Sequence, residues 1–311
     1  MSNNKRLVFH TILILLMWIT PAAAFWGSQS AGTTGANFLK IGVGARAVGM
    51  GGAFVAIAND ATSSYWNPAG LSQLEQQEVA FTHNEWLGNI KYEYLGYGLP
   101  LGKRTGLGVG LIYLHMGSIP GYDRQGNSTS SFTAYDAAML LGLSRQLNQN
   151  TSLGIGLKWI SQKLESENSR SFALDMGCLW KMDNFSVGLT VNNVGTPIKF
   201  IREEFVLPSK IGLGLAYRTL DDKLVFAADF DFPNDTKPIF KQGLEYNYQN
   251  SLFLRSGCQY RSEQNVDEKT ELSFGGGFRM LNCDLDYTYS PDYGVGSVHR
   301  ISISYKFGPR R

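Results

Sequence analysis

The chain has 311 residues and combines 35 glycines, 15 tyrosines and 18 phenylalanines with only 17% charged residues. This composition is unusual for a soluble enzyme and typical of a glycine-rich, aromatic-rich β protein. The formal net charge is +2, and it falls to about zero once Lys5 and Arg6 of the N-terminal segment are removed. A nucleic acid or a strongly anionic membrane surface is therefore excluded as a partner, since no basic stripe remains to bind it.

The N-terminal segment has the pattern of a signal peptide. Lys5 and Arg6 precede an apolar run over residues 7–19, and Pro21 and three alanines follow it. The run is too short to cross a bilayer as a helix. We expect residues 1–24 to be a signal peptide that is removed before Phe25.

The next segment is rich in glycine between Gly42 and Gly52 and reads GVGARAVGMGG. It lacks the Gly-Lys-Ser/Thr ending of a phosphate-binding loop, and no strand of a parallel sheet precedes it. Tight turns inside a compact plug explain the glycines better. Alanines 53, 56, 58 and 61 would let short helices pack closely in such a plug.

From residue 78 onward, apolar and small or polar residues alternate with a period of two in segments of about ten residues. Ten residues is the length that a tilted strand needs to cross a bilayer. We count fourteen such segments, centred near residues 81, 94, 110, 138, 157, 176, 188, 213, 228, 245, 256, 276, 287 and 303. Outer-membrane barrels of bacteria have an even number of strands, so the pattern predicts a fourteen-stranded antiparallel transmembrane β-barrel, an all-β fold.

The connections between these segments alternate in length. Those after the even-numbered segments are short, at residues 100–104, 147–150, 182–184, 220–222, 249–250 and 281–282. Those after the odd-numbered segments are mostly longer, at residues 117–131, 194–207, 261–269 and 290–298, and only the first, at residues 87–89, departs from the rule. Barrels with short periplasmic turns and longer outer loops show this alternation, which places both termini in the periplasm.

Charged residues on one face of the later segments distinguish the barrel from a soluble β-sandwich, because a dry core could not hold them unpaired. The expected lumen charges are Asp229, Asp231, Lys241, Glu245, Arg255, Arg279, Asp284, Asp286 and Lys306. Asp284 and Asp286 lie two residues apart and could be an acid/base pair, but a ladder of salt bridges is the better explanation.

No pattern of reactive residues indicates an enzyme or a cofactor site. The cysteines at positions 178, 258 and 283 lack a Cys-x-x-Cys spacing, and the histidines at positions 10, 83, 115 and 299 are far apart. Neither a disulfide framework nor a metal site is therefore expected. We expect a protein without cofactor or metal that is not an enzyme.

The last segment alternates Ile301, Ile303, Tyr305 and Phe307 with polar residues, which predicts a lipid-facing, aromatic-ended final strand. Outer-membrane strands usually end at the terminal aromatic residue. Here residues 308–311, Gly-Pro-Arg-Arg, follow it.

Residues 56–74, AIANDATSSYWNPAGLSQL, resemble the N-terminal hatch of the FadL-like outer-membrane proteins, which ends in an Asn-Pro-Ala turn. That turn is Asn67-Pro68-Ala69 here, and the longer stretch over residues 38–71 is similar to the PorV/PorQ branch of the same superfamily. The resemblance implies a hatch, or plug, over residues 25–77 on the periplasmic side of a barrel formed by residues 78–311. In the plug, Asp60 and Asn67 can cap turns and Pro68 suits a first helical position. Tyr65 and Trp66 would brace the plug against the barrel wall, and Arg46 needs an acidic partner such as Asp60, Asp229 or Glu245.

The resemblance leaves two functions open, and we favour the first because the hatch is retained whereas no docking surface can be read from the sequence. One is transport of hydrophobic small molecules across the outer membrane of a Gram-negative-type bacterium, with Arg46, Asp60, Tyr65 and Trp66 packing the plug or lining the path. The other is that of a PorV-like adaptor or shuttle barrel in type IX protein secretion. The expected partners are outer-membrane lipid and either a hydrophobic ligand or a component of the secretion machinery. The loops at residues 119–133 and 261–270 are polar or charged, which weakens specific uptake of long-chain lipids.

Overall fold

A computed structural model describes residues 33–85, 90–261, 269–292 and 296–311. The predicted signal peptide and the first predicted hairpin lie outside these residues. Four short helical elements precede the first strand: η1 (Asn37–Lys40), α2 (Ala45–Gly49), α3 (Ser63–Trp66) and η2 (Pro68–Gln73). In the described residues, no helix is long and apolar enough to cross a membrane.

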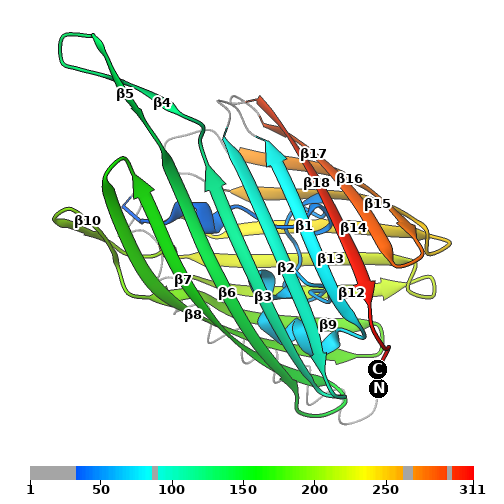
Figure 1. Ribbon diagram of the computed structural model, residues 1–311. Coiled ribbons are helices and arrows are strands. Elements are labelled where there is room, and N and C mark those ends of the chain that lie inside the picture. Colours follow the sequence, from blue (N-terminus) through cyan, green and yellow to red (C-terminus); the bar gives the residue numbers. More distant parts are fainter. Residues whose placement is uncertain (1–32, 86–89, 262–268, 293–295) are drawn as a thin grey trace.

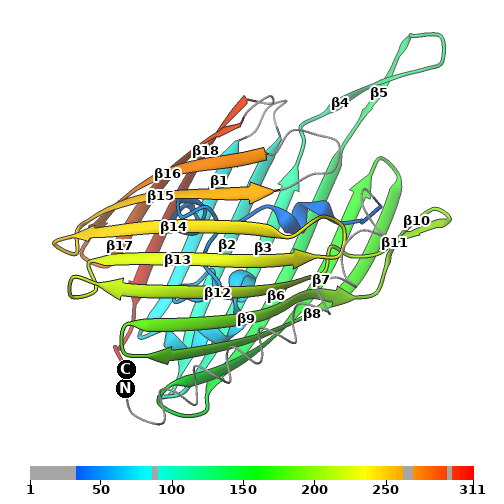
Figure 2. The same cartoon turned by 180° about the vertical axis from the view of Figure 1, so that it is seen from behind.

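Fourteen strands form a closed antiparallel barrel, as the sequence predicted (Figures 1 and 2). The barrel strands are β1 (Gln77–Glu85), β2 (Lys91–Leu101), β3 (Thr105–His115), β6 (Ala134–Gln146), β7 (Thr151–Leu164), β8 (Glu167–Met182), β9 (Phe185–Gly195), β12 (Lys210–Thr219), β13 (Leu224–Pro233), β14 (Ile239–Tyr248), β15 (Leu252–Arg261), β16 (Lys269–Met280), β17 (Cys283–Asp292) and β18 (Gly296–Phe307). Each strand pairs with its neighbour along the barrel, and β1 pairs with β18 to close it.

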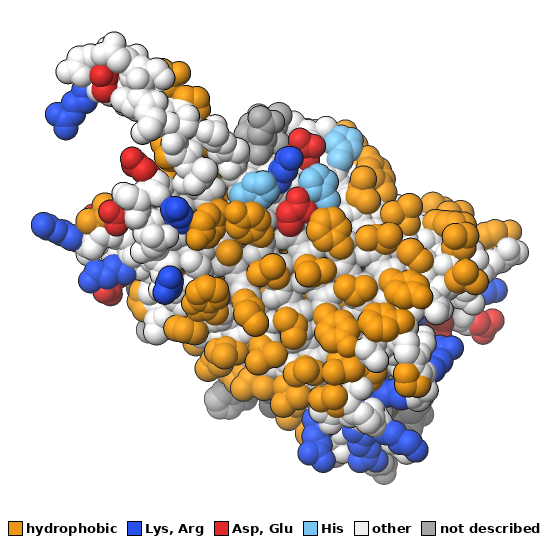
Figure 3. Space-filling model, in the orientation of Figure 1, with side chains coloured by type: hydrophobic (Ala, Val, Ile, Leu, Met, Phe, Trp, Pro, Cys, Tyr) orange, Lys and Arg blue, Asp and Glu red, His pale blue; other side chains and the backbone are white. Residues whose placement is uncertain are grey.

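The alternation of residue types separates the two faces of the wall. Outward positions carry large apolar side chains that are 36–62% exposed in most strands, for example Leu95, Leu111, Phe226 and Ile303. On the face that Figure 3 shows, these side chains form a broad apolar surface over the barrel wall. Many inward positions on the same strands are glycine, small polar residues or buried charges, and large side chains such as Tyr92, Tyr94 and Ile112 are fully buried there against the plug.

The short connections are tight turns that rely on left-handed backbone conformations. Asp183, Leu220, Gln249 and Leu281 all have positive φ angles between 50° and 57°. Two-residue hairpins favour such conformations because their twist matches that of the flanking strands. All six turns that the sequence predicted to be short join adjacent barrel strands at the same end of the barrel (Figure 1).

The sequence treated residues 117–131 and 194–207 as loops, and the structure corrects this. Strands β4 (Ile119–Tyr122) and β5 (Ser128–Phe132) form a hairpin, and β10 (Ile198–Phe200) and β11 (Glu203–Phe205) form another. The β4–β5 hairpin projects well beyond the barrel wall (Figure 1). Its strands were missed because serine, threonine and glycine give no apolar alternation.

The described segment before β1, residues 33–76, lies inside the barrel and contacts strands on opposite sides of the wall. Helix α2 packs against β15, β16 and β17, and η2 packs against β3, β6, β7 and β8. The expected close-packed helices around alanines 53, 56, 58 and 61 are wrong in detail, because these residues lie in turns. The alanines are nonetheless fully buried, so their small size still serves close packing. We call residues 33–76 the plug.

Candidate functional site: the plug, the lumen charges and two cavities

The Asn67-Pro68-Ala69 turn anchors the plug to the barrel wall. The Asn67 side chain accepts a hydrogen bond from the Ala69 amide at 3.1 Å, and Pro68 occupies the first position of η2. The side-chain nitrogen Nδ2 of Asn67 donates to Val55 O at 2.8 Å within the plug and to Cys178 O at 3.2 Å on β8. One fully buried side chain therefore caps a helix, ties two plug segments together and binds the wall.

Tyr65 and Trp66 tie segments of the plug together through hydrogen bonds to its backbone. The Tyr65 hydroxyl donates to Leu39 O and Ile41 O at 3.0 Å, and burial raises its pKa above the ordinary value, so it remains a donor. The Trp66 indole nitrogen donates to Val43 O at 3.0 Å. On the wall side, the Lys241 ammonium lies 5.8 Å from the Trp66 ring and the Lys158 ammonium 5.7 Å from the Tyr65 ring. Helix α3, which contains both aromatic residues, also packs against β3 and β6. The bracing role expected from the sequence stays a prediction.

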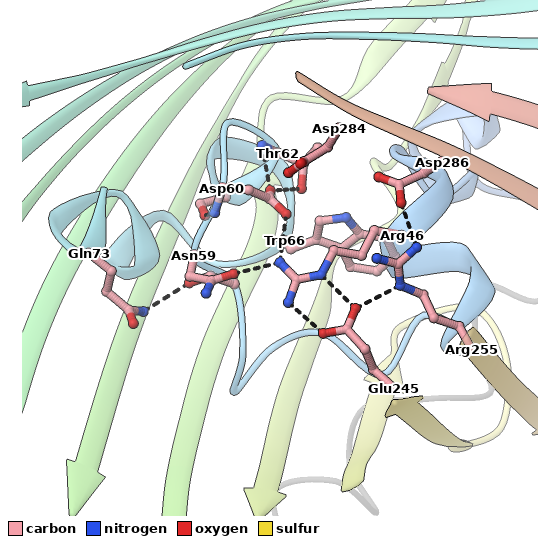
Figure 4. Close-up of polar contacts among 12 residues, drawn as sticks. Arg46, Asn59, Asp60, Thr62, Trp66, Gln73, Glu245, Arg255, Asp284 and Asp286 are labelled. Atoms are coloured by element: carbon pink, nitrogen blue, oxygen red, sulfur yellow. Dashed lines mark hydrogen bonds and ion pairs between the residues drawn. The ribbon is translucent and has the colours of Figure 1, made fainter. Parts of the chain in front are cut away.

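Arg46 connects the plug to the lumen charges (Figure 4). Its guanidinium forms a two-pronged ion pair with Glu245 on β14, with both N–O distances at 2.9 Å. On its other side it reaches Asn59 at 2.8 Å and Asp60 at 3.4 Å, and Asp60 itself accepts from the Thr62 amide. Of the three acids that the sequence offered as partners for Arg46, the structure brings Glu245 and Asp60 to it.

Further lumen charges extend this arrangement along the wall. Arg255 bridges Glu245 and Asp286, with both distances at 2.6 Å. Asp284 accepts from Arg279 at 2.5 Å and lies 3.4 Å from Lys306, so the neighbouring acids Asp284 and Asp286 are salt-bridge partners with different bases. This geometry leaves neither carboxyl group free to act as one half of an acid/base pair.

Two other lumen acids lie on β13. Asp231 is shared by Lys210 at 2.8 Å and Lys241 at 2.6 Å. Asp229 has no cation within ion-pair distance among the described residues, and it accepts instead from the amides of Phe54 and Val55 at 2.8 and 2.9 Å. The wall therefore holds the plug backbone as well as its side chains.

Two cavities lie on opposite sides of the plug. The first, of about 400 Å³, is bounded by Leu39, Ile41, Tyr65 and Trp66 of the plug and by the ends of strands that lead into the long connections. The second, of about 290 Å³, is lined by Arg46 and the charged network and lies toward the short turns. Trp66 and Tyr65 line only the first cavity, and Arg46 and Asp60 only the second.

Sequence reasoning missed a polar cluster on the other side of the lumen. Lys158 of β7 binds Asp175 of β8 at 2.7 Å and Asn193 of β9 at 2.6 Å. Asn193 has a φ of 60° and lies where the β8–β9 register shifts, so its amide donates to the Asp175 carboxylate. The charges on β7 and β8 were detectable, but the extra residue on β9 left no pattern in the sequence.

The last two residues fasten the plug at the short-turn end. Arg310 forms an ion pair with Glu75 at 2.5 Å. The Arg311 guanidinium donates to Ser72 O of η2 and to Gly102 O between β2 and β3, both at 2.6 Å. The residues that follow the terminal aromatic thus link the plug, the final strand and the β2–β3 turn.

We expect the Arg311→Ala variant to lose about 1 kcal/mol of stability, because the lost hydrogen bonds involve a charged but largely exposed group. Thermal unfolding of the purified barrel in detergent measures the effect. Lys103→Ala removes a cation from the adjacent turn and is the control. Equal midpoints for the two variants would show that Arg311 does not fasten the plug.

In the described residues, no group of three histidine, cysteine, aspartate or glutamate side chains is arranged to hold a metal ion.

Comparison with known proteins gives a partial sequence match and a fold. The uncharacterised protein family UPF0164 matches residues 22–163, which is less than half of the chain. A UPF0164 protein of Treponema pallidum (strain Nichols) is 26% identical over 173 residues, covering 50% of this chain and 43% of that protein. The chain thus spans less than half the length of this curated relative.

Solved structures similar to this chain are FadL-type barrels. The CymD monoaromatic hydrocarbon channel has a TM-score of 0.64 at 16% identity and covers 87% of this chain and 99% of its own. The Pseudomonas putida toluene transporter TodX has a TM-score of 0.60 at 16% identity, covering 85% and 96%. A Pseudomonas aeruginosa FadL homologue has a TM-score of 0.60 at 12% identity, covering 86% and 98%. At these identities the likeness establishes the fold, which agrees with the predicted FadL-like barrel.

Proposed function

We propose that this protein is an outer-membrane barrel that admits hydrophobic small molecules, and that the plug closes it. The observation that carries the proposal is the plug itself. It separates a partly apolar cavity of about 400 Å³ from a charged one of about 290 Å³ inside a closed barrel. A binding pocket of this size suits a small ligand.

The apolar outer surface supports a location in a membrane. Side chains such as Phe81, Leu141, Leu254 and Phe274 are 43–54% exposed although they are strongly apolar, which would be costly in water. The lumen is polar and charged, as it is in barrels that cross the outer membrane. The names of the similar structures, a monoaromatic hydrocarbon channel and a toluene transporter, agree with a hydrophobic permeant.

The orientation follows from the connections. Short turns face the periplasm in outer-membrane barrels, so the C-terminus and the charged cavity would be periplasmic and the β4–β5 hairpin external. Single cysteines at Gly126, at the tip of that hairpin, and at Asn250, in a short turn, test this. We expect a membrane-impermeant thiol reagent to label only the Gly126→Cys variant on intact cells, after the native cysteines are replaced. Equal labelling of both variants would contradict the orientation.

Uptake of labelled toluene by cells whose own hydrocarbon uptake is abolished tests the transport function. We expect uptake that saturates with concentration and depends on expression of the barrel. Absence of saturable uptake, together with co-purification of a large membrane complex, would instead favour the adaptor.

The PorV-like adaptor remains the second candidate because of one observation. The β4–β5 hairpin projects beyond the wall and exposes 67% of Tyr122, which gives a partner a place to dock (Figure 1). Such a projection is not needed to line a path through the lumen. Deleting residues 119–131 should abolish an adaptor function and leave uptake of a small permeant intact.

A further inference from the structure

Among the described residues, one buried cation of the barrel lacks a partner. Arg300 of β18 is only 4% exposed, yet its guanidinium makes neither a hydrogen bond nor an ion pair with any described residue. The other three buried cations of the described chain, Lys158, Lys241 and Arg255, all bind carboxylates. An unpaired buried charge is costly, so it persists where something outside the chain compensates it.

The surroundings of Arg300 are unsatisfied as well. Asn84 lies directly opposite it in the β1–β18 pair and is fully buried. Neither the nitrogen nor the oxygen of the Asn84 side chain has a hydrogen-bond partner in the described chain. The nearby Tyr92 hydroxyl is already committed to Ile41 O at 2.9 Å. Arg300 and Asn84 together therefore offer several donors with nothing to accept them.

Arg300 lines the cavity of about 400 Å³ that lies between the plug and the long connections. The three acids of that cavity are occupied: Asp231 binds two lysines, Asp235 binds Lys40, and Glu271 lies 3.9 Å from Arg261. Among the described residues, five cations line the cavity, namely Lys40, Lys210, Lys241, Arg261 and Arg300, against these three acids. The excess of positive charge makes an anion the complementary ligand.

The plug side of the cavity is largely apolar and includes Leu39, Ile41, Val48 and Trp66. We propose that this cavity is a binding site for a small organic anion, in which Arg300 takes the acid group and the plug receives a short apolar body. The planar guanidinium fits a carboxylate through two parallel hydrogen bonds. The site goes beyond hydrocarbon passage and does not depend on it, because it would bind an anion whether or not the barrel conducts.

The test uses the full-length barrel purified in an uncharged detergent, with benzoate as the probe and benzyl alcohol as its uncharged counterpart. Trp66 lines the cavity, so tryptophan fluorescence can report binding. We expect saturable benzoate binding that weakens at least tenfold in Arg300→Gln, whereas the exposed Arg310→Gln variant is unaffected. Benzyl alcohol should bind the native protein and Arg300→Gln equally.

Thermal unfolding separates a binding role from a structural one. Without ligand, Arg300→Gln should be as stable as the native protein or more stable, because it removes an uncompensated charge. Benzoate should raise the native midpoint and leave that of the variant unchanged. Undiminished benzoate binding by Arg300→Gln, no saturable binding by the native protein, or a lower midpoint of the ligand-free variant would each overturn the proposal. Inorganic phosphate bound as tightly as benzoate would overturn the role of the apolar body.

Discussion

Replacing Gly257 of β15 with alanine should displace the plug and open the barrel to small solutes. A Cβ atom at this position would lie closer than 3.0 Å to the backbone of Met50 and Gly51. Neither backbone can move away easily, because Gly257 belongs to the hydrogen-bonded barrel sheet and Gly51 belongs to a tight turn of the plug with a φ of 66°. Overpacking of this kind costs about 1–3 kcal/mol. We expect a lower unfolding midpoint and faster entry of a small sugar into proteoliposomes.

Gly276 of β16 provides the matched control. A Cβ atom there meets nothing within 4 Å, so Gly276→Ala should change neither stability nor solute entry. Gly106→Ala on β3 repeats the test on the opposite wall, where the added atom would press on the backbone of Leu71 and Ser72. If Gly257→Ala lowers stability without admitting the sugar, the plug is not what closes the lumen.

These glycines show what the sequence could and could not predict. The alternation around Leu107 and Val109 predicted a strand, and the structure places the glycines between them on the inward face, against the plug. That the plug backbone rests on Gly106 was not predictable, because the strand pattern alone does not say what fills the lumen. The barrel was therefore derivable from local periodicity, whereas the seating of the plug depends on contacts between residues far apart in the sequence.

The same limit applies to the charges. The sequence placed Arg46 in the plug and offered Asp60, Asp229 and Glu245 as partners, but only the register of β13 and β14 against the plug decides among them. Glu245 reaches the guanidinium, whereas Asp229 points to the amides of Phe54 and Val55. The sequence did not single out Arg300, because it occupies an inward position in the alternating pattern of β18 like many other polar residues. The sequence feature that could have identified it is that neither residue opposite Arg300 on the neighbouring strands is an acid: these residues are Asn84 and Thr288.

Glu245→Gln should destabilise the barrel most among single charge changes in the lumen. Glu245 is 5% exposed and binds both Arg46 and Arg255, so the substitution leaves two guanidinium groups around a neutral amide. Arg255 retains Asp286 at 2.6 Å, but Arg46 retains only Asp60 at 3.4 Å. Removing one partner of a buried ion pair costs about 3–5 kcal/mol. A fall of the unfolding midpoint by many degrees is the expected result.

A double-mutant cycle with Arg46→Met distinguishes the ion pair from a general effect of the lumen. In the Arg46→Met background, Glu245→Gln removes a partner from Arg255 alone, and Arg255 keeps its ion pair with Asp286. The two substitutions together should therefore lower the free energy of unfolding by clearly less than the sum of their separate effects. Glu75→Gln is the matched control, since Glu75 pairs with Arg310 at the surface, where ion pairs contribute about 0–1 kcal/mol. Additive effects of the two lumen substitutions would mean that Arg46 does not hold the plug through Glu245. The plug would then be retained by its backbone contacts with the wall, and Gly257→Ala would become the stronger way to open the barrel.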